Sequence, residues 1–447
     1  MARTICARPL AALWTAGLIL GGSGGLLAQE EECVLEPSPE ATSAATALDE
    51  ARVAEDPAEA QAKFLEAWDA VDGELRDDPA PYLLGAQALV GLRDFAKADS
   101  LLVRFEELAP ECFPVHGRNA RYNAWVGLYN EGIQAYQTDD VEVALEAFNT
   151  ANMMFAEARS YNNAGILYEQ SGRTDLAIEN YRKAIVAEGD EEQKRNAVLS
   201  LASLVGAEGS PEEALPIYEQ FLEMNPDDVV VRIRYALTLS DAGRGAEATG
   251  IFEEVLNRED LTMEQWVEVG VGLFNSEEYG NAAVAFGKAR RGNPYGKEAM
   301  ENFVNAAIQE GQVAEALPLA DSLVNWYPYD ASEYQLLASG LAKGGDDDQA
   351  LALLQVSQTN AIIFHSSQMA DLGGGQYVVR GVVESRDAAA GQTVTISFEF
   401  LSGTGDVIGS EDLTVQLPAA GQTDTFRVDF QSAAPVAGFR YAKVECL

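Results

Sequence analysis

Histidine, a common metal ligand and catalytic base, is scarce in this chain of 447 residues. The two histidines, His116 and His365, lie 249 positions apart and outside any recognisable motif, so we expect them to be exposed or structural rather than catalytic. No HExxH, Walker or GxGxxG pattern occurs in the sequence. The sequence therefore predicts a non-catalytic protein without a cofactor or a metal site, and an enzyme is the least favoured alternative.

The first 28 residues have the pattern of a secretory signal peptide. Arg3 and Arg8 precede a short apolar run over residues 10–20, and a glycine-rich stretch leads to Ala28. We therefore predict cleavage after Ala28 and export to the periplasm, the envelope or the exterior of a bacterium. An uncleaved N-terminal anchor is the alternative. No segment after the signal is long and apolar enough to predict a membrane span.

Three cysteines remain once the signal peptide is removed: Cys33, Cys112 and Cys446. An odd number permits at most one intramolecular bridge. In an exported protein, a disulfide between Cys33 and Cys112 would stabilise the N-terminal end of the fold. Three unpaired thiols are the other interpretation, and the sequence does not decide between them.

The net charge of −41 is extreme for a chain that is 47% hydrophobic and 23% charged. The apolar content is sufficient for a buried core. So acidic a chain, without a basic patch, is not expected to bind nucleic acid or an anionic membrane surface, because both would repel it.

Most of the chain follows a period of 34 residues. Ala202, Ala236, Gly270, Val304 and Ala338 occupy the same position in five successive copies. Each is followed at a fixed interval by an alanine, and in four of the five copies by a bulky residue four positions later. The period and the pattern resemble the tetratricopeptide repeat, a helix–turn–helix unit. The resemblance implies a mainly α, right-handed solenoid.

The resemblance also divides the chain into segments. Residues 41–358 are expected to form about seven clear and two degenerate repeats, with a non-periodic insertion near residues 111–124. Residues 29–40 form an acidic segment between the signal peptide and the repeats.

In this repeat class the first helix of each unit lines the concave side of the solenoid, so the resemblance also implies a partner-binding face. Members that clamp the carboxylate of a peptide C-terminus place lysine there, which this chain lacks. The central repeats instead present an apolar strip, followed by a polar end. This strip is either a groove for an amphipathic helix or an extended peptide, or part of the packing between helices. The candidate residues are Tyr129, Ile133, Asn162, Ile166, Glu169, Leu199, Ile233, Leu237, Val267, Val271, Phe274, Glu301, Asn305 and Gln335.

After Gln358 the hydrophobic period changes from 3.6 to 2. Val394, Ile396, Phe398 and Phe400 alternate with polar residues, as in a half-buried strand. Further strands are expected within 376–383, 412–417, 425–430 and 439–444. Residues 359–447 are therefore predicted to form a small antiparallel β-sandwich. The run Phe398–Ser402 resembles the FxLYD-type immunoglobulin-like modules of exported bacterial proteins.

Together these patterns predict an exported scaffold or adaptor that holds a peptide or helix of a partner protein in the solenoid groove. The sandwich is expected to bind a second partner or to cap the last repeat, because the end of a solenoid otherwise exposes an apolar face. The main alternative is a structural component of the cell envelope that self-associates through the solenoid.

Overall fold

The computed structural model describes residues 33, 35, 38–386 and 391–442. The predicted signal peptide and Cys446 lie outside the described residues. Contacts divide the chain into two compact units. The first comprises residues up to Gly127 together with Met153–Phe155, and the second comprises Leu128–Asn152 and Ala156 onward.

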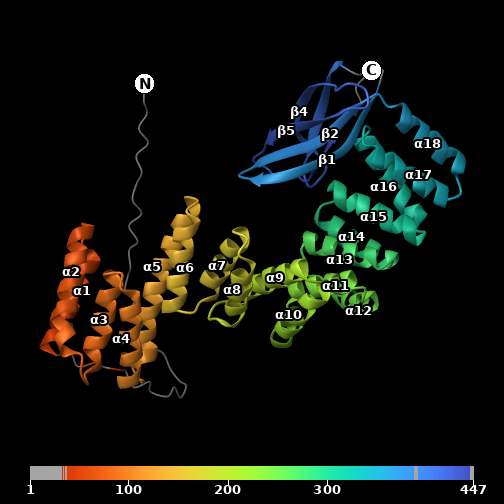
Figure 1. The fold of residues 1–447 in the computed structure, drawn as a ribbon. Helices are drawn as coiled ribbons and strands as arrows, with labels where there is room; N and C mark the ends of the chain where they lie inside the picture. The colour runs from red at the N-terminus through yellow and green to blue at the C-terminus, as the bar shows by residue number, and fades with distance from the viewer. Residues whose placement is uncertain (1–32, 34, 36–37, 387–390, 443–447) are drawn as a thin grey trace, which may run out of the picture. The chain divides into compact units, whose positions relative to one another are not determined.

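Eighteen α-helices occupy the described residues up to Thr359, as the tetratricopeptide pattern predicts (Figure 1). They are α1 (Pro39–Val53), α2 (Pro57–Val71), α3 (Pro79–Gly91), α4 (Phe95–Leu108), α5 (Arg118–Gln137), α6 (Val141–Met154), α7 (Ala158–Gln170), α8 (Thr174–Val186), α9 (Glu191–Glu208), α10 (Pro211–Met224), α11 (Val229–Asp241), α12 (Gly245–Leu256), α13 (Met263–Asn275), α14 (Tyr279–Gly292), α15 (Lys297–Glu310), α16 (Val313–Trp326), α17 (Ala331–Lys343) and α18 (Asp347–Thr359). Consecutive helices pair as hairpins, one per repeat.

Side chains at the helix starts explain where many helices begin. The carboxylates of Asp56, Asp78 and Asp190 accept hydrogen bonds from backbone N–H groups of α2, α3 and α9, which have no partner within the helix. Thr262 and Gln265 form a reciprocal capping box at α13. These caps recur because each repeat needs two helix starts.

A small residue on the first helix of a repeat makes room for a ring on the second. A Cβ atom added at Gly165 would lie 2.6 Å from the ring of Tyr181, and one at Gly270 would lie 2.5 Å from the ring of Phe286. Tyr181 and Phe286 are themselves almost fully buried. The ring therefore packs inside its own hairpin, and this contact determines how closely the two helices approach.

The segment predicted as a non-periodic insertion, residues 111–124, has regular structure. It contains η2 (Phe113–Gly117), a short π-helical turn, and the first two turns of α5. A short 3-10 turn, η1 (Asp72–Glu74), follows α2. Cys112 precedes η2 and forms a disulfide with Cys33, the pairing that was one of the two alternatives from the sequence. Among the described residues no helix combines the length and apolar composition that crossing a bilayer requires.

The C-terminal strands form two antiparallel three-stranded sheets, with the orders β1-β2-β5 and β4-β3-β6. Phe400 stacks on Phe430 with ring centroids 4.0 Å apart, which joins the two sheets into the predicted small sandwich. β1 was not predicted, because its exposed second half and its bulge after Phe364 obscure the alternation. The strands are β1 (Ile362–Gly373), β2 (Gln376–Ser385), β3 (Thr393–Leu401), β4 (Val407–Gln416), β5 (Thr423–Gln431) and β6 (Gly438–Tyr441).

Within the second unit, the sandwich packs against the turns that precede α15 and α17 (Figure 1). The Tyr327 hydroxyl donates to the carbonyl of Phe439 at 2.7 Å, and the Asn293 amide donates to the carbonyl of Ala437 at 2.6 Å. Leu351 on α18 stays 60% exposed. The expectation that the sandwich caps the last repeat is therefore wrong, because its partners are inter-repeat turns rather than the outer face of α18.

Gly438→Ala is expected to destabilise this contact. A Cβ atom there would lie 2.2 Å from the carbonyl oxygen of Tyr295, and neither backbone can yield easily, so we expect a loss of about 1–3 kcal/mol in urea denaturation. Gly403→Ala is the matched control, since a Cβ atom there has no neighbour within 4 Å. Equal stability of the two variants would contradict the prediction.

Candidate functional site

The structure separates the predicted groove residues into three groups. Ile233 and Asn162 are buried, and Ile233 belongs to the apolar core of the solenoid with 0% exposure, which is the packing role that the sequence left open. Glu169, Val271 and Gln335 are exposed. The half-buried residues are Tyr129, Ile133, Ile166, Leu199, Leu237, Val267, Phe274, Glu301 and Asn305. Which of them contact a partner stays a prediction.

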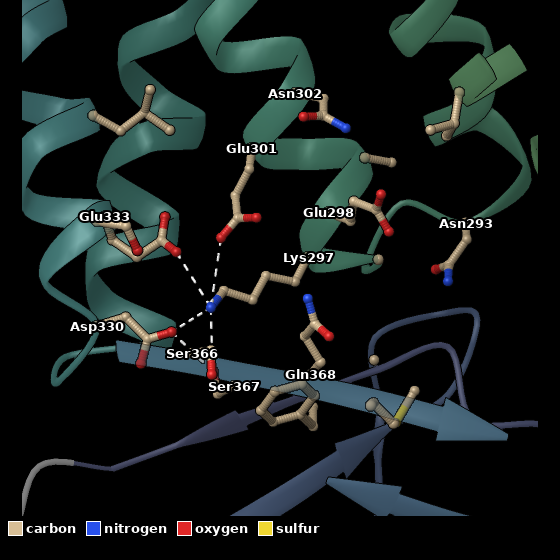
Figure 2. A pocket seen from close by; sticks show the side chains of 18 of the residues that line it. Asn293, Lys297, Glu298, Glu301, Asn302, Asp330, Glu333, Ser366, Ser367 and Gln368 are labelled. Carbon is tan, nitrogen blue, oxygen red and sulfur yellow. Dashed lines mark hydrogen bonds and ion pairs between the residues drawn. The ribbon is translucent and has the colours of Figure 1, made fainter. Parts of the chain in front are cut away.

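Three of these residues, Val267, Glu301 and Asn305, line a cavity of about 680 Å³ in the second unit (Figure 2). Its walls come from α13, α15, the start of α17, and strands β1 and β6. A volume of this size lies within the range of about 300–1,000 Å³ that is usual for ligand pockets. The remaining predicted residues do not line it.

Lys297, in the first turn of α15, lines this cavity (Figure 2). Its ammonium contacts the carboxylate of Asp330 and lies 3.4 Å from Glu333 Oε1 and 3.5 Å from Glu301 Oε1. It also lies 4.6 Å from the ring centre of Tyr327. Burial alone would lower the pKa of Lys297, but the three carboxylates outweigh it and raise that pKa. The side chain is therefore a charged lysine that is only 13% exposed.

Asp330 joins the repeats to the sandwich. It precedes α17 and is 1% exposed. Its carboxylate accepts hydrogen bonds from the hydroxyl of Tyr441 on β6 and, at 2.8 Å, from the hydroxyl of Ser367 on β1. Because Lys297 also contacts it, one buried carboxylate connects a repeat helix to both sheets of the sandwich. Such charge-assisted bonds are strong and directional.

Glu333, one turn further along α17, is 1% exposed. Neither of its carboxylate oxygens has a hydrogen-bond partner among the described residues, and its closest cation is the ammonium of Lys297. Burial and the neighbouring carboxylate of Glu301 raise the pKa of Glu333 to about 9. At neutral pH this side chain is therefore protonated and uncharged.

Glu333→Gln is expected to flatten the pH dependence of stability in the second unit. The pKa of Glu333 is raised from an ordinary value of 4.5 to about 9 on folding. Its contribution to stability is therefore complete below pH 4.5 and is lost as the pH rises towards 9. Lys297, Glu301 and Asp330 surround the carboxyl group of Glu333. The wild type should therefore lose stability as the pH rises from 4.5 towards 9.

Thermal melts at several pH values would measure this effect. Glu315→Gln, an exposed position on α16, is the matched control and should keep the wild-type slope. If Glu333→Gln also keeps that slope, Glu333 is not the group responsible.

The central residues of this site were missed by reasoning from the sequence. Lys297, Asp330 and Glu333 lie outside the two positions per repeat that are expected to face a partner. One available signal was the i, i+4 spacing of Lys297 and Glu301, which places both on one helix face. Nothing in the repeat pattern indicates that this face meets the sandwich.

Comparison with known proteins supports the repeat assignment. The family profile described as "Tetratrico peptide repeat" matches residues 157–260, which include α7 to α12. Within residues 157–260 the chain carries tetratricopeptide repeats. Photosystem I assembly protein Ycf3 of Acaryochloris marina is 27% identical over 110 residues, covering 25% of this chain and 66% of that protein. Tetratricopeptide repeat protein 21B of Xenopus laevis is 22% identical over 213 residues, covering 43% of this chain and 16% of that protein.

The chain thus spans 16% of the length of one of these relatives and 66% of the length of the other. Among solved structures, PilF of Pseudomonas aeruginosa has a TM-score of 0.37 at 18% identity, with 50% of this chain and 99% of that chain covered.

Proposed function

We propose that this protein is an exported, non-catalytic scaffold that holds a segment of a partner polypeptide. The observation that carries the proposal is the cavity in which Val267, Glu301 and Asn305 of the repeats face the sandwich. The cavity lining combines apolar and polar side chains, which come from both the helical repeats and the sandwich. Such a combination is usual for sites of specific binding.

The repeat architecture supports a role in binding proteins. Tetratricopeptide repeats present surfaces rather than reaction centres, and one relative is named as an assembly protein. A role in holding or assembling other proteins agrees with the repeat architecture and with the name of that relative. The face that the resemblance assigns to a partner includes the exposed Val271 and Gln335.

Export is supported by the predicted signal peptide and by the disulfide between Cys33 and Cys112, since such bonds persist in oxidising compartments. Expression of the full chain in a bacterium, followed by fractionation, would test this. We expect a periplasmic product that begins at Gln29, and a cytoplasmic product when residues 1–28 are deleted. A full-length chain in the cytoplasm would contradict export.

Site-specific cross-linking would test partner binding in the cavity. A photoreactive amino acid at position 305 should yield a discrete cross-linked product in cells, and the same group at position 315, on the exposed side of α16, should not. Val267→Asp, which places a charge in the cavity wall, should abolish the product. Equal products from positions 305 and 315 would contradict a specific site.

A structural envelope component is the second candidate, and one observation favours it. Leu351 and Val356 of α18 are exposed, and a groove follows the pair α17 and α18. If this end mediates assembly, light scattering of the mature protein should show growth with concentration, which Leu351→Glu should reverse. A constant monomer mass would favour the scaffold.

A further inference from the structure

We propose that the cavity between α13, α15, α17 and the sandwich receives a basic side chain, arginine or lysine, of the partner segment, with the carboxylates of Glu298 and Glu301 as its receptor. This inference rests on the proposed function, because it names the chemistry of the segment that the scaffold holds.

The charges around the cavity are unbalanced. Four carboxyl side chains line it: Glu298, Glu301, Asp330 and Glu333. The basic groups of the lining are Lys297 and His365. His365 contacts Glu384 at 2.6 Å, and Lys297 contacts Asp330. Lys297 also lies 3.5 Å from Glu301 Oε1, so Asp330 and Glu301 share one ammonium, and Glu298 has no ion pair among the described residues. A ligand cation would neutralise part of the remaining carboxylate charge.

Glu333 is a further carboxyl side chain of the lining whose oxygens lack a hydrogen bond within the described part of the chain. It lines the cavity, is 1% exposed, and has no hydrogen-bond donor to either carboxylate oxygen among the described residues. Buried acceptors are nearly always paired in folded proteins. A guanidinium has five N–H donors in a planar fork, so it can reach more than one carboxylate from a single position.

The rest of the cavity suits the chain that would carry such a side chain. Asn302 of α15 and Gln368 of β1 line the same space (Figure 2), as does Asn305 of α15. Amide side chains can both donate to and accept from a peptide backbone. Val267 and Leu336 supply apolar surface beside them. The cavity therefore places acidic side chains next to groups that can form hydrogen bonds with the main chain of a peptide.

Selection from a random heptapeptide library at physiological salt would test this inference. We expect the wild type to enrich one basic residue at a fixed position. The variant E298Q/E301Q should lose this enrichment. The variant E310Q/E315Q, which removes two exposed acidic groups outside the cavity, is the charge-matched control and should retain it, since the overall acidity of the protein would otherwise attract basic peptides anywhere.

A selected peptide and its citrulline analogue would then be compared by fluorescence anisotropy. Citrulline keeps the shape of arginine without its charge, so we expect at least a tenfold weaker affinity. E298Q alone should weaken binding of the arginine peptide several-fold, which guards against misfolding of the double variant because Glu298 is exposed.

Each of the following results would contradict a specific part of the proposal. Selected peptides without a basic residue, or equal affinity for the citrulline analogue, would leave peptide binding intact and refute the basic side chain. Equal enrichment by E298Q/E301Q would place the site elsewhere. No enrichment of any peptide would refute both the inference and peptide binding in this cavity. Spermidine binding as tightly as the peptide would assign the cavity to a small polyamine.

Discussion

Lys297→Met is expected to lower the free energy of unfolding of the second unit by about 3–5 kcal/mol, because removing one member of a buried ion cluster leaves the others uncompensated. Asp330 is 1% exposed, so its carboxylate would lose its cation while staying largely out of bulk water. The loss would be measured by urea denaturation followed by circular dichroism. The sandwich should also become more accessible to proteases, because Asp330 anchors it to the repeats through Tyr441 and Ser367.

Lys183→Met is the matched control for this prediction. Lys183 lies in the same unit and pairs with Glu179 four residues earlier, but half of its side chain is exposed. Surface pairs of this kind contribute less than about 1 kcal/mol. If Lys297→Met lowers the free energy of unfolding by no more than Lys183→Met does, the ion cluster around Lys297 does not stabilise the contact between the sandwich and the repeats.

Loss of the bond between Cys33 and Cys112 is expected to have a similarly large effect on the first unit. The two residues are separated by 79 positions, and closing a loop of that length restricts the unfolded chain by about 4–5 kcal/mol in the chain-entropy description. We therefore expect the variant C33A/C112A to lose about 2–5 kcal/mol of stability. Because Cys112 is buried beside η2, the loss should appear in the transition of the first unit.

A reducing agent provides the control for the disulfide. Dithiothreitol should destabilise the wild type to nearly the level of C33A/C112A and should leave that variant unchanged. A wild type that melts identically with and without the reductant would show that the bond does not stabilise this unit.

The repeat fold was predictable because its determinants are local. Gly165 and Tyr181 belong to one hairpin, and the same contact recurs in Gly270 and Phe286 of a later repeat. Each hairpin packs mainly on its neighbours, so a short sequence pattern specifies the structure wherever it recurs. The sandwich was predictable for a similar reason, since alternation along a strand reports directly on which face is buried.

The individual binding residues were less predictable. Ile233 and Val271 both occupy positions that the resemblance assigns to the partner-facing surface. Ile233 is nevertheless fully buried, whereas Val271 is 39% exposed. The burial of such a residue depends on how closely neighbouring repeats approach, and that depends on side chains from several helices at once.

The sequence by itself therefore determined the repeated helical hairpins and the change to strands after Gln358. Only the tertiary structure decided that the sandwich packs on the turns before α15 and α17 and leaves Leu351 and Val356 of α18 exposed. That packing brings the hydroxyl of Tyr441 to the carboxylate of Asp330, 111 positions earlier in the sequence. It also buries Lys297 and Glu333 where the repeats meet the sandwich. The physical reason is that periodicity records contacts within and between adjacent repeats, whereas this contact occurs once and between unlike folds.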